Sequence, residues 1–349
     1  MTMSELTRRD AVDSVLDGFF ATRIARAQAL GGQSALLWRR VAASTQGGKR
    51  VRPRLVLAAH DALGGDDHRS AAIAAAAFEV LHTALLLHDD VLDGDLVRRG
   101  RPNLAGEFAA AALDAGLGPD AATAWGEASG LLAGDLLLSG VHTLLAGIES
   151  PARADIHEIV DECLLQTAAG EHADVGFALG AVEARSADIA RMMEQKTAAY
   201  SFSAPLRTGA ALAGGGADLD AALDRIGADL GFLYQLRDDV LGVFGVEHRT
   251  GKTAMGDLRE GKRTLLIAFA AEHPAWRAVE HLFGRRALEP DDADRLRAAL
   301  VASGAAGEIE RLIVEQREQV EAGIRAAGLP APLAAELGEL ARLCAERDA

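Results

Sequence analysis

A long apolar segment that ends in a cluster of aspartates is the feature that most constrains the fold of this chain. Residues 71–92 are rich in alanine and leucine and have the length and composition of a buried helix. On such a helix Asp89 and Asp93 lie one turn apart on one face, with Asp90 beside them. Carboxylates left together would repel one another and lose hydration, so the cluster predicts a bound divalent cation. Ligands that are all oxygens favour Mg²⁺, which shares its remaining positions with water and phosphate.

A second acidic cluster comprises Gln235, Asp238 and Asp239. Gln235 precedes the two aspartates by about one helical turn, so the three side chains project to one side. A loop that contains Lys252 and Lys262 follows this cluster, as an arginine-containing segment follows the first one. Each cluster is therefore an acidic helix end followed by a cationic loop, which suits an anion that arrives with its own metal ions.

Helical periodicity dominates the whole chain. Alanine and leucine recur at helical spacing, and no run of alternating β-branched residues is long enough for a convincing sheet. The 349 residues, of which 49% are hydrophobic, are enough to bury a large core. Glycine and proline are scattered in short turns and form no linker. We therefore expect an all-α fold in a single domain that spans residues 1–349.

The composition argues against several classes of partner. A net charge of −15 opposes binding to a nucleic-acid backbone. The two cysteines, Cys163 and Cys344, have no metal-binding spacing and fit reduced thiols in a cytoplasm. The N-terminus lacks the apolar core of a secretory signal. The most apolar segment, residues 71–87, is short for a membrane span and is interrupted by Glu79 and His82. We expect a cytoplasmic protein without stable membrane insertion.

Four further motifs stand in a fixed order with the two clusters. They are Gly-Gly-Lys-Arg-Val-Arg-Pro at 47–53, Glu-Val-Leu-His at 79–82, Ala-Gly-Asp at 133–135 and Gln-Lys-Thr-Ala-Ala-Tyr at 195–200. With this ordered set, from about Gly47 to Arg263, the chain resembles the trans-isoprenyl diphosphate synthases of the polyprenyl synthetase family. The resemblance implies a homodimer with an orthogonal helical bundle of the isoprenoid synthase type. It also implies that both acidic clusters face one deep central cavity.

The resemblance implies a reaction as well. In this family an allylic diphosphate ionises to diphosphate and an allylic carbocation. The double bond of isopentenyl diphosphate then attacks the cation, and a proton is lost. Charge separation is the hardest step, and Mg²⁺ ions and lysines stabilise the negative charge that develops on the leaving diphosphate. No side-chain nucleophile is needed for this chemistry.

The resemblance assigns roles to individual positions. The ligands of about three Mg²⁺ ions are expected to be Asp89, Asp90, Asp93, Asp238 and Asp239. The allylic diphosphate is expected to contact Arg98, Lys196 and Lys252, with Lys262 as a further substrate-binding residue. The diphosphate of isopentenyl diphosphate, which binds without metal, is expected to contact Lys49, Arg52, His82 and Arg99. The oxygens of Thr197 and Gln235 are expected to face the carbocation, and Gln235 also counts as substrate-binding. The residues expected to be catalytic are Asp89, Asp93, Lys196, Thr197, Gln235 and Asp238.

Three positions depart from the family pattern. Gly242 stands where the second cluster often has a third aspartate, and Glu171 stands where glutamine is usual. Met255 stands where a glycine is expected, so the path of that loop is open. Gly134 and Asp135 are interpreted as a helix-packing residue and a buried hydrogen bond rather than as catalytic groups.

Product length depends on what blocks the path below the first cluster. Short-chain members of the family carry bulky aromatic residues four or five positions before the first aspartate, where this chain has Leu85 and Ala84. The next large side chains along the helix are Leu81 and Phe78. With roughly one isoprene unit per helical turn of ~5.4 Å, a stop near Phe78 permits about four units. The expected product is geranylgeranyl diphosphate (C20), with C15 or C25 and longer as alternatives.

Two other classes of function stay open. A class I terpene cyclase would share the metal-binding logic, but it needs no site for isopentenyl diphosphate. A non-catalytic partner subunit of a heteromeric synthase would be expected to have lost acidic clusters, whereas this chain keeps the first one complete. An assay with Mg²⁺, isopentenyl diphosphate and several allylic primers separates both from the main interpretation.

Overall fold

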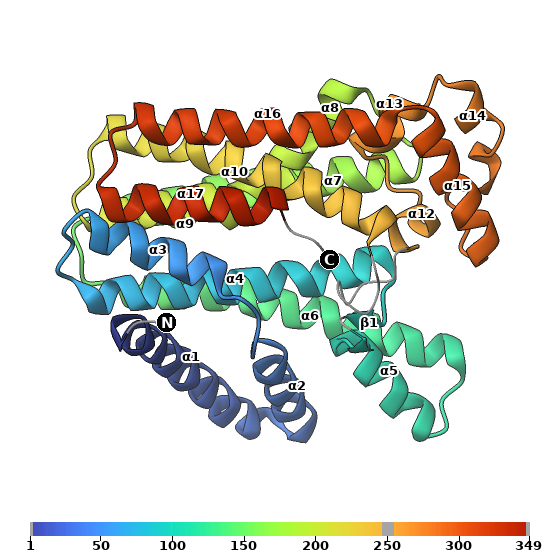
Figure 1. The fold of residues 1–349 in the computed structure, drawn as a ribbon. Coiled ribbons are helices and arrows are strands. Elements are labelled where there is room, and N and C mark those ends of the chain that lie inside the picture. Colours follow the sequence, from blue (N-terminus) through green and yellow to red (C-terminus); the bar gives the residue numbers. More distant parts are fainter. Residues whose placement is uncertain (1–2, 99, 246–254, 347–349) are drawn as a thin grey trace. The chain divides into compact units, whose positions relative to one another are not determined.

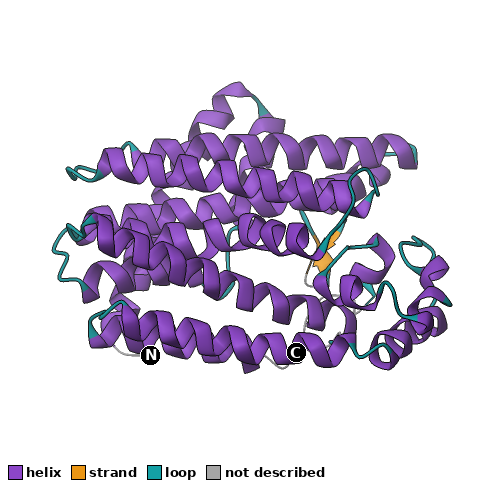
Figure 2. Ribbon diagram, turned by 90° about the horizontal axis from the view of Figure 1, so that it is seen from above, coloured by secondary structure: helices purple, strands orange, loops and turns teal. Residues whose placement is uncertain are grey.

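The computed structural model describes residues 3–98, 100–245 and 255–346, and most of these residues are helical (Figure 1). The strands β1 (Val97–Arg98) and β2 (Arg101–Pro102) form a small antiparallel pair. Within the described residues this pair is the only sheet, and it appears as the single orange patch among helices in Figure 2. The predicted all-α fold is confirmed.

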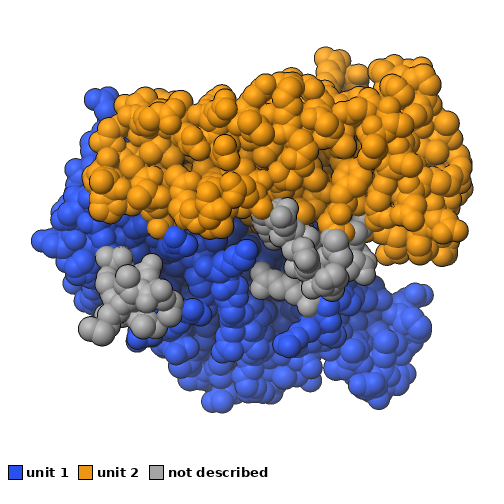
Figure 3. All heavy atoms as spheres, in the orientation of Figure 1, with its two compact units in different colours: residues 1–159, 205–220 blue, residues 160–204, 221–349 orange. Residues whose placement is uncertain are grey.

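The chain divides into two compact units (Figure 3). Unit 1 comprises residues 1–159 and 205–220, and unit 2 comprises residues 160–204 and 221–349. The first acidic cluster belongs to unit 1 and the second to unit 2. The predictions of one domain and of a shared cavity between the clusters therefore stay predictions, and each unit is described by itself.

Unit 1 is built around a central helix, α4 (His68–Asp93). The helices that complete the unit are α1 (Met3–Leu30), α2 (Gly32–Ser44), α3 (Val51–Ala62), α5 (Leu104–Asp114) and α6 (Pro119–Leu145). Parts of α7 (Arg153–Ala178), α9 (Ala204–Leu212) and α10 (Ala217–Phe244) also belong to it. Helix α4 packs against α1, α3, α5 and α6, so its alanine-rich surface is covered on several sides.

Local chemistry sets both ends of α4. The side chain of Asp67 accepts a hydrogen bond from the Ser70 amide at 2.9 Å, which caps the first turn. Gly94, with a φ of 70°, ends the helix in the left-handed conformation that glycine adopts without strain. Helices α4 and α6 are both long and apolar enough to cross a membrane, but 83% of the apolar window of α4 is buried inside the structure. Helix α4 is therefore the core helix that the sequence predicts.

Glycines let α6 approach its neighbours closely. A Cβ atom at Gly126 would lie 2.4 Å from the carbonyl oxygen of Ala105 in α5. A Cβ atom at Gly134 would lie 2.2 Å from Nε2 of His88 in α4. The interpretation of Gly134 as a packing residue is thus confirmed. The expectation for Asp135 is wrong, because its side chain is 61% exposed, although it lies 3.3 Å from the same His88 nitrogen.

Unit 2 contains the remaining helices among the described residues. They are the later part of α7, α8 (Ser186–Met193), η1 (Glu194–Ser203), most of α10, α12 (Gly256–Glu260), α13 (Leu265–Ala270), α14 (Pro274–Arg277), η2 (Glu280–Leu282), α15 (Pro290–Ala302), α16 (Ala305–Ala326) and α17 (Ala331–Glu346). Helix α16 packs on α13 and α17, and the core includes the fully buried side chains of Ile189, Leu223 and Trp276.

The segment η1 is a π-helix, a rare form whose hydrogen bonds span five residues instead of four. Three glycines of the neighbouring helices lie directly against its backbone. A Cβ atom at Gly170 of α7 would lie 2.3 Å from an atom of Lys196. In α10, a Cβ atom at Gly227 would lie 2.5 Å from Ser203, and one at Gly231 would lie 2.2 Å from Ala198. Helices α7 and α10 therefore pack on η1 at backbone distance, which fixes the position of the side chains that η1 carries.

Candidate active site

The first acidic cluster lies at the C-terminal end of α4, as predicted. After Gly94 the chain turns into β1, and this turn returns Arg98 to the aspartates. The Arg98 guanidinium donates to Asp90 Oδ1 at 2.7 Å and to Asp89 Oδ2 at 3.1 Å. Asn103 caps α5 and also donates to the Asp95 carbonyl at 2.7 Å, so the returning segment is held at both ends.

Burial and pairing act together on the charges of this cluster. The Asp90 side chain is only 4% exposed, and this burial raises the pKa of Asp90, although the charge of Arg98 opposes the rise. Burial lowers the pKa of Arg98, but the Asp90 and Asp89 carboxylates raise it by more. One guanidinium balances one of the three carboxylate charges. The oxygen donors and the remaining negative charge fit a divalent cation such as Mg²⁺.

The basic residues predicted to bind isopentenyl diphosphate begin at the start of α3. Lys49 is exposed and Arg52 is half-buried, and between them lies Arg50, with a φ of 51°. Among the described residues, Arg50 is the one non-glycine residue with a positive φ. Its guanidinium lies 3.1 Å from Glu79 Oε1 of α4 and 3.5 Å from Asp13 Oδ1 of α1.

This arrangement ties the basic loop to α4. A positive φ costs about 1 kcal/mol or more in a non-glycine residue, so the ion pair with buried Glu79 offsets strain at the start of α3. Glu79 precedes His82 by three residues, so both project from one side of α4. Arg99, the fourth residue of this predicted set, lies outside the described residues.

In unit 2 the structure brings Thr197 and Gln235 together. Thr197 Oγ1, on η1, donates to Gln235 Oε1 at 2.9 Å, and Gln235 Nε2 donates to Asp239 Oδ1 at 2.7 Å. The chain of bonds thus fixes the amide orientation of Gln235 with the nitrogen toward the carboxylate. The sequence singled out all three residues, but the contact between Thr197 and Gln235 depends on the π-helix that carries Thr197.

Asp239 is nearly buried, with 6% of its surface exposed. Burial raises the pKa of Asp239 well above its ordinary value, and the charges of Asp257, Asp238 and Asp174 raise it further, against the hydrogen bond from Gln235. Asp238 is half-exposed. The cluster is again made of oxygen donors with excess negative charge, so it fits Mg²⁺ by the same criterion.

Gly242 has a specific neighbour. A Cβ atom at this position would lie 1.9 Å from Oδ2 of Asp257, which is on α12. The Asp257 carboxylate therefore occupies the space that a side chain at position 242 would need. Met255, where the family pattern has glycine, directly precedes α12, and Asp257 still lies in the first turn of that helix.

Lys196 lies between two carboxylates of α7. Its Nζ is 2.6 Å from Asp174 Oδ2 and 2.9 Å from Glu171 Oε2. The departure at Glu171 therefore adds a second anionic partner for Lys196. Lys262 lies 2.9 Å from Glu260, whereas Lys252 lies outside the described residues.

The residues predicted to control product length all lie on α4. Phe78, Leu81 and Ala84 are fully buried, and Leu85 is half-exposed. The difference between Ala84 and Leu85 agrees with the rotation of about 100° per residue along a helix. Their predicted role in setting product length stays a prediction.

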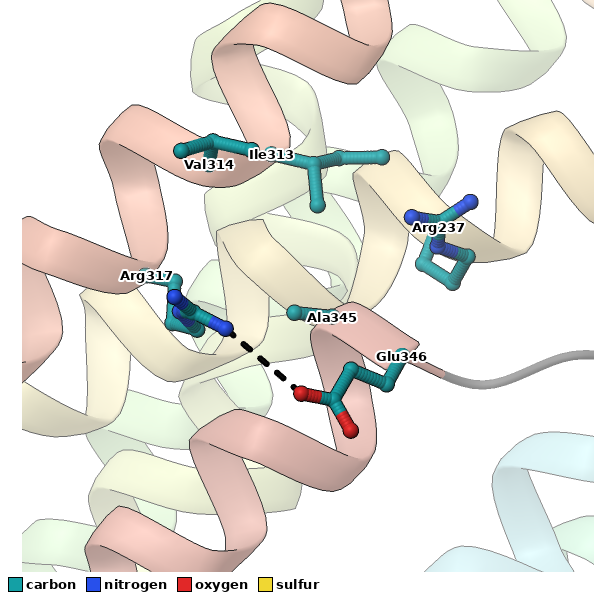
Figure 4. Close-up of a pocket in the computed structure, with 6 residues that line it drawn as sticks. All are labelled: Arg237, Ile313, Val314, Arg317, Ala345 and Glu346. Carbon is teal, nitrogen blue, oxygen red and sulfur yellow. Dashed lines mark ion pairs between the residues drawn. The ribbon is translucent and has the colours of Figure 1, made fainter.

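A pocket of about 480 Å³ in unit 2 lies apart from these residues (Figure 4). It is lined by Arg237, Ile313, Val314, Arg317, Ala345 and Glu346. Arg317 faces Glu346 across it at 3.6 Å, and Arg237 is held by Glu310 through two hydrogen bonds of 2.8 Å and 3.0 Å. Both arginines are thus matched by carboxylates, and none of the predicted site residues belongs to this lining.

The chain is similar in sequence to known prenyl diphosphate synthases. The sequence profile of the family described as "Polyprenyl synthetase" matches residues 37–300. A geranylfarnesyl diphosphate synthase of Aeropyrum pernix is 33% identical over 74% of this chain and 77% of its own length. A (2E,6E)-farnesyl diphosphate synthase of Mycobacterium bovis is 33% identical over 86% of this chain and 80% of its own.

Solved structures agree with the sequence relatives. The geranylgeranyl pyrophosphate synthase of Corynebacterium glutamicum, crystallised with isoprenyl diphosphate and magnesium, superposes with a TM-score of 0.90. It is 29% identical, and the match covers 97% of this chain and 98% of that one. The fold is therefore that of the isoprenoid synthases, as the resemblance implied.

Proposed function

The chain belongs to the polyprenyl synthetase family and is a prenyltransferase, and we propose that its product is all-trans geranylgeranyl diphosphate (C20). It joins isopentenyl diphosphate head-to-tail to an allylic diphosphate by ionisation, condensation and elimination. The observation that carries this reaction is the acidic end of α4, where the guanidinium of Arg98 pairs with Asp89 and Asp90 and Asp93 lies one turn after Asp89. An anionic leaving group needs such a site when it arrives with metal ions.

Different side chains are proposed to bind the two diphosphates and to face the carbocation. The diphosphate of isopentenyl diphosphate is bound by Lys49 and Arg52 at the start of α3 and by His82 on α4. Arg98 and Lys196 bind the allylic diphosphate. Arg98 and Lys196 both contact carboxylates in this structure, so each would exchange a carboxylate partner for phosphate oxygens when the substrate binds. Thr197 and Gln235 present polar oxygens toward the cationic carbon.

Mg²⁺ is the cofactor that this donor set fits. We propose about three ions, two held by Asp89 and Asp93 with Asp90 in support, and one held by Asp238 with Asp239. The ions supply Lewis acidity and screen the two diphosphates from each other. The relative from Corynebacterium glutamicum was crystallised with magnesium, which supports this choice.

The proposal of a C20 product rests on the small residues before the first cluster. The relatives include enzymes named for farnesyl, geranylgeranyl and geranylfarnesyl products, so family membership leaves length open. Ala84 leaves space one turn or so before Asp89, and the buried ring of Phe78 provides a floor further along α4. Phe78 lies eleven residues, or about three helical turns, before Asp89, which at one unit per turn leaves room for about three isoprene units beyond the unit that carries the diphosphate.

The deciding experiment incubates the purified chain with Mg²⁺, isopentenyl diphosphate and allylic primers of C5, C10 and C15, and identifies the products by mass. We expect C20 diphosphate from every primer. Cyclic hydrocarbons formed without consumption of isopentenyl diphosphate would indicate a terpene cyclase. Absence of turnover, restored only by a second synthase chain, would indicate a partner subunit.

The same assay on tunnel variants tests the assignment of length. Ala84→Phe places a ring across the path and is expected to shift the product to C15 or shorter. Phe78→Ala removes the floor and is expected to give C25 and longer. Leu85→Phe is the control, because Leu85 is half-exposed and its effect should be smaller. An unchanged distribution from Ala84→Phe removes the main support for C20.

A homodimer and a cytoplasmic location complete the proposal. The exposed leucines of α6, namely Leu131, Leu132 and Leu136, form an apolar surface that a second copy would cover. Light scattering should give twice the monomer mass, and Leu132→Glu should reduce it. The cytoplasmic location is supported by Cys163 and Cys344, which are both buried free thiols, and cell fractionation tests it.

A further inference from the structure

Two histidines and an aspartate meet where α3 connects to α4, within unit 1. His60 and Asp61 lie in the last turn of α3, and His68 is the first residue of α4. One ligand atom from each side chain lies within 4.8 Å of the other two. We propose that these three side chains bind a divalent transition metal of the zinc class, at a site separate from the acidic helix ends.

The distances suit a tetrahedral ion. Asp61 Oδ1 lies 2.9 Å from His60 Nδ1 and 3.5 Å from His68 Nδ1. Ligands at the usual zinc distances are about 3.4 Å apart when the angles are tetrahedral. The two observed separations bracket this value, so the set closes around an ion with small movements of side chains.

The ligand set of this cluster disfavours Mg²⁺, the ion proposed for the prenyl transfer reaction. Two imidazoles and one carboxylate suit zinc, nickel or copper, whereas Mg²⁺ prefers a shell of oxygens. The exposed side of the cluster leaves room for water as a fourth ligand, because the His68 side chain is 74% exposed. A metal can therefore enter from solvent without a change in fold.

Two of the three ligands are held in place by the fold. His60 is completely buried, and a Cβ atom at Gly65 would lie 2.3 Å from its Nε2 atom. This close approach of the glycine backbone fixes the ring with Nδ1 toward Asp61. The His60 Nε2 atom has no hydrogen-bond partner among the described residues, so packing rather than a polar contact holds that edge of the ring. Asp61 is the next residue of the same helix and moves with it.

The cluster is remote from the first acidic cluster. His68 begins α4, and Asp89 lies near its other end, which places the two about 30 Å apart along the helix axis. A metal here would therefore join α3 to α4 without contacting the substrate. Its expected effect is on stability, because an ion that binds only the folded chain raises the melting temperature.

The test titrates chelator-treated full chain with ZnCl₂ by calorimetry, in excess Mg²⁺ so that the acidic clusters are saturated. The wild type is expected to bind one Zn²⁺ per chain and to gain about 3 °C or more in Tm. His68→Ala removes an exposed ligand and is expected to weaken binding at least tenfold and to abolish the gain. His281→Ala, which removes an exposed histidine of unit 2, is the matched control and should behave as the wild type.

Spectroscopy gives an independent measurement. Co²⁺ bound by the wild type should show the intense visible bands of a tetrahedral site, and Asp61→Asn and His68→Ala should lose them. If His68→Ala binds Zn²⁺ as tightly as the wild type, the proposal is wrong. If the wild type gives no Zn²⁺-dependent signal, the three side chains form a hydrogen-bonded cluster alone, and the proposal is equally wrong.

Discussion

The two acidic clusters hold their carboxylates in different ways. At the end of α4, Asp89 and Asp90 are bonded directly to the guanidinium of Arg98. In α10, Asp239 accepts a hydrogen bond from the neutral amide of Gln235, and the charges that act on it are those of other carboxylates. In the first cluster the charge of Arg98 therefore offsets part of the burial that raises the pKa of Asp90, whereas in the second the neighbouring carboxylates add to the effect of burial on Asp239.

This difference indicates different roles for similar sequences. In the cluster of unit 1 the guanidinium of Arg98 limits the rise in the pKa of Asp90, so less of its charge has to be restored by a metal ion. The cluster in unit 2 is expected to acquire its full charge together with the ion that we propose it binds, because a buried carboxyl with a raised pKa loses its proton most easily when a cation replaces it.

The largest expected effect comes from the first cluster. Asp89→Ala and Asp93→Ala should each lower kcat/KM by about 10³-fold or more, since several kcal/mol of electrostatic stabilisation are lost with the metal. Asp238→Ala should cost less, because we propose that the second cluster holds one ion and the first holds two. The measurement is steady-state turnover at saturating Mg²⁺, with circular dichroism to show that each variant is folded. A near-normal rate from Asp89→Ala would falsify the metal role.

The next effect concerns the contact between Gly242 and Asp257. Gly242→Ala should displace the Asp257 carboxylate and lower kcat/KM about tenfold, which is roughly 1.4 kcal/mol. The matched control is Gly338→Ala, since nothing lies within 4 Å of a Cβ atom at that helical position. Gly242→Ala and Asp257→Ala should combine less than additively, because both remove the same carboxylate from its place. Full additivity would show that the contact does not matter for turnover.

The smallest effect is on stability without metal. Burial raises the pKa of Asp239 above its value in the unfolded chain, so ionisation opposes folding as pH rises from about 4 toward the raised pKa. Asp239→Asn should therefore stabilise the metal-free protein at pH 7 by about 1 kcal/mol, and the gain should vanish near pH 4. Asp90→Asn should stabilise less than Asp239→Asn, because the charge of half-buried Arg98 offsets part of the burial that raises the pKa of Asp90.

Urea unfolding in EDTA at pH 7 and pH 4 measures both variants. Equal stabilisation by the two substitutions at pH 7 would remove the contrast between the clusters.

The sequence predicted the helices better than the contacts between them. The apolar segment 71–92 became α4 with only a few residues added at each end, because Asp67 and Gly94 are ordinary capping residues. The pairing of Arg98 with Asp90 depends on the turn into β1 and on the cap at Asn103, which no periodicity reveals. The placement of Asp257 against Gly242 likewise depends on where a loop returns to its helix.

The π-helix was beyond any analysis that assumes 3.6 residues per turn. Residues 194–203 resemble a continuation of α8 when helical spacing is counted. A signal for it existed in Gly170, Gly227 and Gly231, small residues that face one segment from two helices, but their meeting is visible only in three dimensions.

The π-helix also makes the chain unusually sensitive to length at one point. Each of its hydrogen bonds encloses one residue more than an α-helical bond, so removal of Gln195 would let the segment relax to the commoner ladder. Such a deletion would improve the local backbone energy and yet rotate Lys196 and Thr197 by about 100° relative to α8. Lys196 would leave Asp174, and Thr197 would leave Gln235. Insertions or deletions in this segment would therefore be selected against because they displace Lys196 and Thr197, even where they lower the energy of the helix backbone.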